Sequence, residues 1–232
     1  HLAKAASISG IMEKCTEAKY RVGATGTIDE SSKTNKLTLE GLFGPVYQVT
    51  TTRQLMDENS VSELKIKCIV LKYDEDTRKM FKGTEYQKEL DWLVQNDARN
   101  KFIRNLAIST SGNTLVLFNF VNKHGKIIYE SLRSKLKDTR PVYFIHGGVD
   151  TKDREEIRNI VNHHDNAIIV ASYATMSTGS NIPSIRNVIF AHPSKSKIRN
   201  LQSIGRGLRL DSGKNYCTLF DLCDDLHWKS WK

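Results

Sequence analysis

The chain has 232 residues, of which 39% are hydrophobic and 26% are charged, and its formal net charge is +9. That length holds one large domain, or one whole domain and part of another. The positive charge favours a polyanionic partner, with nucleic acid first and an acidic membrane surface second, and no run approaches the roughly 18 apolar residues of a membrane-spanning helix.

The cysteines bear on the cellular compartment of the chain, and the first residue bears on whether the chain is part of a longer protein. The four cysteines include no Cys-x-x-Cys pair, so nothing indicates a disulfide framework or a zinc site, and we expect no metal ligands in this chain. A reducing, intracellular compartment fits this usage, and we expect the cytoplasm. The chain opens at His1 without a methionine, inside an expected helix, so we expect a piece of a longer protein.

The first sixty residues predict short elements separated by polar turns. Apolar residues at helical spacing, short β-rich runs and a Gly-Pro stop are the signals. We place a domain boundary near Asn59, just before a longer β-rich run. In chain order we expect a helix at 2–15, a strand at 20–24, a helix at 37–43, a weak strand at 46–49, and a helix at 51–59 capped by Thr50 or Thr51.

From Glu63 onward, apolar strands alternate with helices. This alternation is typical of a parallel sheet covered by helices on both faces, in which ligands bind at the carboxyl ends of the strands. The expected strands are 63–73, 114–118, 142–145, 167–171, 187–191 and 216–220. The expected helices are 75–94, 97–109, 121–135, 151–163 and 196–210.

The segment 196–210, interpreted as a helix, has two distinct sides. An apolar stripe of Leu201, Ile204 and Leu208 lies on one side, as a core-facing stripe should. A solvated basic face is the ordinary interpretation of the other side. Gly205 and Gly207 argue against that interpretation, because each costs up to about 1 kcal/mol in a helix. Glycine there suits close approach of a ligand to the backbone. Guanidinium groups also fit phosphate oxygens. The residues of the polar side are Arg199, Gln202, Arg206 and Arg209.

Two loops and several histidines follow the expected strands. The loop 172–183 offers small hydroxyl residues to phosphate or ribose, although an ordinary polar loop explains it equally well. His146-Gly147-Gly148, which follows the expected strand at 142–145, is a weak signal alone. His163 and His164 lack partners at metal-ligand spacing and fit a helix C-terminus. His124 and His192 are interpreted as surface loop residues.

In their order along the chain, these pieces resemble the motifs of DExH-type superfamily 2 helicases. The matches follow one another correctly over about 190 residues, which is far more specific than any single match. Among such helicases, the chain is most similar to the recombination and branch-migration enzymes of bacteriophages. Gly23–Thr27 is similar to motif III, Leu115–Phe120 to motif IV, Ser172–Pro183 to motif V and Gln202–Arg209 to motif VI, with His146–Gly148 and Arg154 similar to the segment between motifs IV and V.

The resemblance implies an α/β fold with a RecA-like, mostly parallel sheet and helices on both faces. Residues 59–232 would be the second helicase domain, and residues 1–58 the tail of the first, ATP-binding RecA-like domain. His1 would end the Asp-Glu-x-His box. Because no phosphate-cradling Gly-x-x-x-x-Gly-Lys-[Ser/Thr] sequence occurs, we expect the Mg²⁺ ligands upstream of this chain, and we expect the chain alone to hydrolyse no ATP.

The resemblance also implies roles for single residues. Arg209 would be the arginine finger, Arg206 its partner on the γ-phosphate, and Gln202 the third catalytic residue. Asn181 stands where aspartate is common, and Ser172 where threonine is common. The other implied ATP contacts are Gly179, Asn181 and His1. The implied coupling residues are Thr25, Gly26 and Thr27. The implied DNA contacts are Asn119, Lys123, His146, Gly147, Ser172 and Thr175.

Three functions remain open from the sequence. The first is the C-terminal half of an ATP-dependent DNA helicase or translocase that acts on forks, four-way junctions and R-loops in recombination, repair and replication, with ATP, Mg²⁺ and DNA as its partners. The second keeps the motor but gives it another track, as an RNA helicase or the translocating subunit of a restriction enzyme. The third is a nucleic-acid-binding module without an ATPase role.

Overall fold

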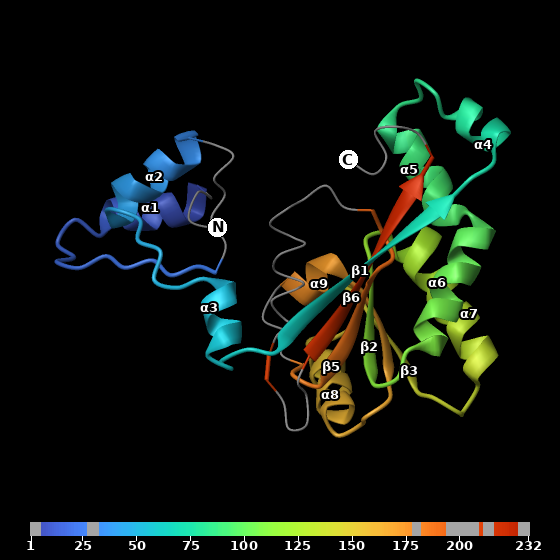
Figure 1. Cartoon of the computed structure of the whole chain (residues 1–232). Helices are drawn as coiled ribbons and strands as arrows, with labels where there is room; N and C mark the ends of the chain where they lie inside the picture. The colour runs from blue at the N-terminus through green and yellow to red at the C-terminus, as the bar shows by residue number, and fades with distance from the viewer. Residues whose placement is uncertain (1–5, 27–32, 178–181, 194–208, 211–215, 227–232) are drawn as a thin grey trace.

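A computed structural model describes residues 6–26, 33–177, 182–193, 209–210 and 216–226. Within these residues, six strands form one sheet in the order β1-β6-β5-β2-β4-β3, and every neighbouring pair is parallel (Figure 1). The predicted α/β class and its parallel sheet are therefore confirmed. The strands are β1 (Glu63–Lys72), β2 (Asn113–Phe118), β3 (Val142–Ile145), β4 (Ile168–Ser172), β5 (Ile185–Phe190) and β6 (Tyr216–Asp225).

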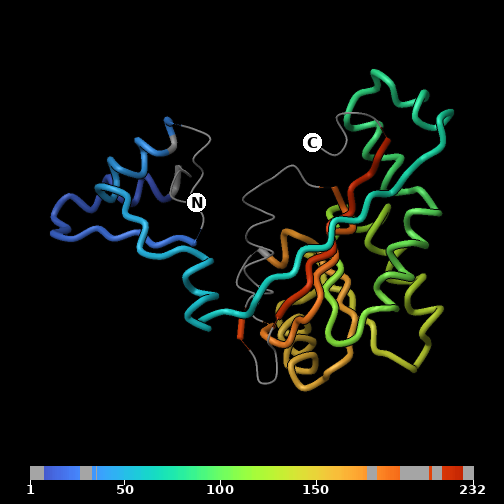
Figure 2. The backbone as a smooth tube through the Cα atoms, viewed as in Figure 1, coloured from blue at the N-terminus to red at the C-terminus, as the bar shows by residue number. Residues whose placement is uncertain are grey.

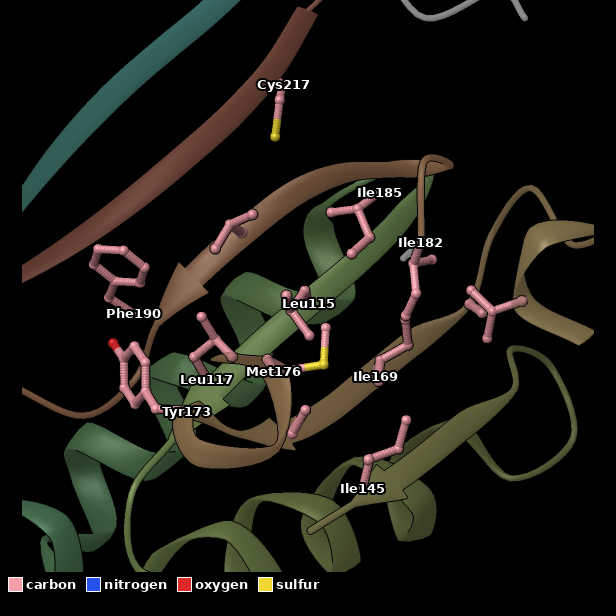
Figure 3. Packing of buried hydrophobic residues seen from close by; sticks show 14 of the residues in the cluster. Leu115, Leu117, Ile145, Ile169, Tyr173, Met176, Ile182, Ile185, Phe190 and Cys217 are labelled. Carbon is pink, nitrogen blue, oxygen red and sulfur yellow. The ribbon is translucent and has the colours of Figure 1, made fainter. Parts of the chain in front are cut away.

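Helices cover both faces of this sheet. One hydrophobic cluster joins β2, β4 and β5 to α8 (Thr151–Asn162) and α9 (Tyr173–Ser177), and Figure 3 shows Tyr173 and Met176 packed against these strands. The second cluster packs the opposite face against α6 (Asp97–Ser109) and α7 (Lys126–Leu136). Every residue of β2 and β4 is buried, which explains their continuous apolar sequence.

The segment before the sheet contains α1 (Ala6–Lys14), α2 (Lys33–Phe43) and α3 (Thr52–Asp57). Figure 2 shows the chain passing from α3 into β1, with α1 and α2 lying apart from the sheet. Thr51 caps α3 in a reciprocal capping box with Gln54, as the expected cap at Thr50 or Thr51 requires. Gly44, with a φ of 86°, follows α2. The domain boundary near Asn59 stays a prediction.

The two strands predicted in this first segment are wrong. Residues 20–24 and 46–49 form no strand, and Val22 and Val49 are 87% and 93% exposed. No strand in the described part of the chain pairs with either segment. A single extended segment gains no cross-strand hydrogen bonds or side-chain pairs, so local β propensity alone does not form a strand.

Other predicted elements are divided or begin differently. The helix expected at 75–94 is wrong, because Gly83 at a φ of 80° separates α4 (Glu75–Met80) from α5 (Tyr86–Gln95). The helix expected at 121–135 begins as a π-helical turn, η1 (Val121–Gly125), before α7. The loop expected after β4 opens with α9, and β6 continues five residues beyond its expected end.

The described residues include neither a helix suited to cross a membrane nor a cluster of metal-ligating side chains. No helix there combines the length and apolar character needed to cross a membrane. The same part of the chain contains no group of three or more His, Cys, Asp or Glu side chains arranged to hold a metal ion. The four cysteines are free thiols.

Candidate nucleic-acid interface and nucleotide residues

Three neighbouring strands end together at the carboxyl edge of the sheet. Phe118 of β2 pairs with Ser172 of β4, and Ile145 of β3 pairs with Ala171 of the same strand. Asn119 and His146, the residues that follow β2 and β3, therefore lie at the level of the end of β4. Neighbouring strands are about 4.8 Å apart, so these predicted DNA contacts share an edge roughly 10 Å wide.

The turn after β3 has an exposed tip. Its first residue, His146, is half-buried against Phe144, with 4.9 Å between the ring centroids. The Nδ1 atom of His146 accepts a hydrogen bond of 3.1 Å from the Gly148 backbone N–H. Gly147 is exposed, and a Cβ built on it would meet nothing within 4 Å. A phosphate backbone could therefore approach this turn closely at Gly147.

Ser172 and Thr175 have less access to solvent than a direct DNA contact needs. Their exposed fractions are 6% and 5%, and their hydroxyl oxygens lie 2.5 Å apart. The Thr175 backbone N–H also donates to the Ser172 hydroxyl, at 3.2 Å, at the start of α9. These hydroxyls hold the first turn of α9, and their contact with DNA stays a prediction.

Lys123 extends from η1, directly after the end of β2. Its ammonium lies 2.5 Å from Oδ1 of Asp91 on α5 and 4.2 Å from the centroid of the Phe120 ring. Both charged side chains are 39% exposed. Hydrogen bonding from Lys123 is the main cause that lowers the pKa of Asp91 below its ordinary value, so the carboxylate remains charged at neutral pH. Lys123 is thus a partly exposed cation beside the expected DNA path.

A buried ionic cluster supports the other part of this edge. The Arg99 guanidinium of α6 donates to both carboxylate oxygens of Asp224 on β6, at 2.9 and 3.0 Å, and to the backbone oxygen of Ala191 after β5, at 2.7 Å. Tyr73, after β1, donates its hydroxyl to Asp224 at 2.7 Å, and burial beside that carboxylate raises the pKa of Tyr73. This cluster was missed from the sequence, because the expected strand stopped at Phe220.

The interpretation of His124 and His192 as surface loop residues is wrong. His124 is fully buried and His192 is 3% exposed. The two ring centroids are 6.0 Å apart, and His192 also meets Phe120 edge-on at 5.1 Å. Burial, followed by the positive charge of Arg99, holds the pKa of His124 well below its ordinary value. The π-helical turn places His124 under the edge instead of on the surface.

Most predicted nucleotide and coupling residues lie outside the described part of the chain. These residues are His1, Thr27, Gly179, Asn181, Gln202 and Arg206. Thr25 and Gly26 are exposed in an irregular segment. Arg209 is exposed, and its backbone oxygen accepts a hydrogen bond of 3.3 Å from the hydroxyl of Ser62, next to the start of β1. The catalytic, ATP-binding and coupling roles stay predictions.

Comparisons with known proteins identify the class of the sheet domain. Residues 97–211 match the family described as the helicase conserved C-terminal domain. The predicted resemblance of the chain to the C-terminal portion of superfamily 2 helicases is confirmed.

The particular relatives are a phage DNA helicase and a subunit of a bacterial restriction enzyme. The chain is 36% identical over 227 residues to the ATP-dependent DNA helicase UvsW of Enterobacteria phage T4, covering 97% of this chain and 44% of that protein. It is 26% identical over 155 residues to the type I restriction enzyme EcoKI endonuclease subunit of Escherichia coli, covering 62% of this chain and 13% of that subunit. The chain thus spans less than half the length of either relative.

Solved structures agree with the RecA-like fold. The crystal structure of T4 UvsW matches with a TM-score of 0.59 and 31% identity, over 84% of this chain and 39% of that one. A fragment of a putative HsdR subunit of a type I restriction enzyme from Vibrio vulnificus matches with a TM-score of 0.64 and 18% identity, over 86% of this chain and 38% of that one. The second match supports the fold alone.

Proposed function

We propose that the chain is the C-terminal half of an ATP-dependent DNA helicase or translocase that acts on branched DNA. The observation that carries the proposal is the 36% identity, along 97% of the chain, to a protein named as an ATP-dependent DNA helicase. Forks, four-way junctions and R-loops are the proposed substrates. Recombination, repair and replication are the processes in which such structures arise, and DNA is the proposed partner.

The proposed DNA path follows the ends of β2, β4 and β3. Asn119 and Gly147 are exposed there, and Lys123 and His146 are half-exposed. Amide, backbone, imidazole and ammonium groups all bind phosphate or sugar without reading bases. A translocase needs this kind of contact, because its affinity must not depend on the sequence along which it moves.

The proposed nucleotide site uses ATP with Mg²⁺ between two RecA-like domains. Mg²⁺ supplies charge neutralisation at the phosphates, and we assign its ligands to the upstream domain. Gln202, Arg206 and Arg209 of this chain would contact the nucleotide from the second domain. The hydrogen bond from Ser62 holds the Arg209 backbone where the N-terminal segment joins the sheet, the side on which the first domain is expected. An arginine there stabilises charge that develops on the γ-phosphate.

The test measures ATP hydrolysis and fork unwinding by the natural protein that contains this chain. We expect DNA-stimulated ATP turnover and displacement of a strand from a forked duplex. Arg209→Ala should lower kcat for ATP by about 10³-fold, the lower range for an arginine finger, with fork binding retained. Arg53→Ala is a matched control on α3, where an exposed arginine pairs with Asp57 at 3.1 Å. Unchanged turnover in Arg209→Ala would support the non-catalytic binding module instead.

A second candidate is the translocating motor of a restriction enzyme. Both the EcoKI subunit and the HsdR fragment resemble this chain, the latter with a TM-score of 0.64. Such a motor would displace a third strand from a triplex along intact duplex DNA without unwinding a fork. Triplex displacement in the absence of fork unwinding would favour this candidate, and strict dependence on RNA would favour an RNA helicase.

A further inference from the structure

The Lys123 ammonium is already paired before any nucleic acid arrives. It contacts the Asp91 carboxylate at 2.5 Å and stands over the Phe120 ring at 4.2 Å. An aromatic ring attracts a cation through its negatively charged face, and here it adds to the attraction of the carboxylate. The cation that lies closest to the expected DNA path on η1 is therefore held from two sides.

Asp91 is itself fixed on α5. Its Oδ1 atom accepts a second hydrogen bond, at 3.1 Å, from Nε2 of Gln87 one turn earlier. Leu90, Leu93 and Val94 bury the other side of α5. The carboxylate is therefore directed at Lys123 by a packed helix.

Lys123, the other partner of this pair, is held by the π-helical turn η1. His124, next to Lys123, is fully buried. A Cβ built on Gly125 would lie only 2.6 Å from the Phe118 ring, so the turn packs directly against β2. Because His124 and Gly125, the two residues that follow Lys123, are both packed against the core, the backbone of Lys123 has little freedom to move away from Asp91.

We propose that Asp91 is a positioning residue that sets the affinity of the nucleic-acid interface, by sharing the Lys123 ammonium with the DNA phosphate backbone. This inference rests on the proposed function. An ammonium has three N–H donors, so it holds the carboxylate and a phosphate oxygen together. The two anions then repel each other across the shared cation. The contact positions the backbone but holds each phosphate weakly, which suits a motor that releases every phosphate it passes.

The test measures the binding of a forked DNA to the natural protein by fluorescence anisotropy at several salt concentrations. Asp91→Asn keeps an oxygen acceptor for Lys123 and removes the negative charge. We expect about 5- to 10-fold tighter binding at low salt, with a smaller gain at high salt because screening weakens the repulsion. Asp91→Glu keeps the charge and should restore affinity to within about twofold of the original.

Two further variants decide whether the effect passes through Lys123. In a Lys123→Ala background no ammonium holds a phosphate oxygen beside the Asp91 carboxylate, so Asp91→Asn should change affinity by less than about twofold. Asp57→Asn removes the carboxylate of the Arg53–Asp57 pair on α3 and should leave affinity unchanged. Equal gains with and without Lys123 would overturn the inference, because they would reflect the net charge alone.

The result also separates the inference from the proposed function. If the unmodified protein binds the fork and Asp91→Asn binds it equally or more weakly, the inference is wrong and the proposed function stands. If the unmodified protein binds no fork and shows no DNA-stimulated ATP turnover, the proposed function is wrong and the inference fails with it. Thermal unfolding of each variant shows whether a change in affinity reflects lost structure.

Discussion

The carboxyl edge of the sheet has two halves that treat charge in opposite ways. Along β2, β4 and β3, polar groups remain partly exposed, and the Lys123–Asp91 pair is 39% exposed on each side. Along β5, β6 and the end of β1, the Arg99–Asp224 pair is 0% and 3% exposed and is surrounded by hydrogen bonds. One half keeps its charges available to a ligand, and the other uses them inside the protein.

This difference follows from the lengths of the strands. β6 and β1 pair as far as Asp225 and Lys72, beyond the point at which β2 and β5 end. The extra length carries Asp224 over the edge and lets Tyr73 and Arg99 close on it. The shorter strands leave their edge open. The edge along β2, β4 and β3 is therefore an open half, and the edge along β5, β6 and the end of β1 is a rigid, filled half of the same sheet.

The largest expected effect tests the filled half. Arg99→Met removes the guanidinium and leaves the Asp224 carboxylate buried beside the Tyr73 hydroxyl, which still donates a hydrogen bond to it. Breaking one side of a buried ion pair costs about 3–5 kcal/mol, so urea unfolding of the full chain should show a loss of that order.

The neighbouring Arg78–Asp225 pair is the control for this loss. Its atoms are 3.6 Å apart and its side chains are 45% and 25% exposed. Arg78→Met should therefore cost less than about 1 kcal/mol. Equal losses for Arg99→Met and Arg78→Met would contradict the distinction between the two halves.

The next effect tests how η1 is attached to β2. In Gly125→Ala the new methyl group would lie 2.6 Å from the Phe118 ring, which is fully buried and stacked on Phe144 at 5.5 Å. Forcing a methyl group into a packed core costs about 1–3 kcal/mol of unfolding free energy. Gly147→Ala is the control for stability, because its Cβ meets nothing within 4 Å. A stability of Gly125→Ala equal to that of Gly147→Ala would mean that the turn is loosely packed.

A smaller effect concerns the buried His124 between the two halves. Its pKa is lowered in the folded chain, mainly by burial, while the unfolded chain keeps the ordinary value of 6.5. Below about pH 6.5 the unfolded chain binds a proton that the folded chain does not. Stability should therefore fall as pH falls, by up to about 1.4 kcal/mol per pH unit from this group.

His124→Phe isolates this contribution, because the ring remains and the titration is lost. We expect the unmodified chain to lose about 1 kcal/mol more than this variant between pH 7.5 and pH 5.5, as measured by urea unfolding. His163→Phe, at the exposed C-terminal end of α8, is the control. The same pH dependence in the unmodified chain and in His124→Phe would assign the loss to other groups.

The sheet could be predicted from the sequence because parallel strands are buried on both faces. The strand expected at 114–118 begins one residue later than β2, and that at 142–145 coincides with β3. Asn119 and His146 each follow an expected parallel strand, which predicted that they would lie at the carboxyl edge of the sheet, and the strand register agrees. Continuous apolar runs carry this information locally.

The remaining features depend on partners that are distant in sequence. β6 extends to Asp225 because β1 pairs with it, and nothing near Asp224 indicates Arg99, 125 residues away. Likewise, His124 is buried by a π-helical turn for which the local sequence has no signal. The break at Gly83 is different, since this glycine was visible within the expected helix and could have ended it.

The smallest expected effect on stability tests the open half and gives the largest contrast in function. Lys123→Ala removes a pair that is 39% exposed on both sides, so it should change the unfolding free energy by less than about 1 kcal/mol. If Lys123 neutralises one phosphate, the same variant should lower the slope of log affinity against log salt by about 0.9 for duplex DNA. Lys79→Ala on α4 removes a lysine that pairs with Glu75 and Asp76 and should leave this slope unchanged. A salt slope unaffected by Lys123→Ala would move the phosphate path away from η1, and the open half would then need another cation to bind DNA.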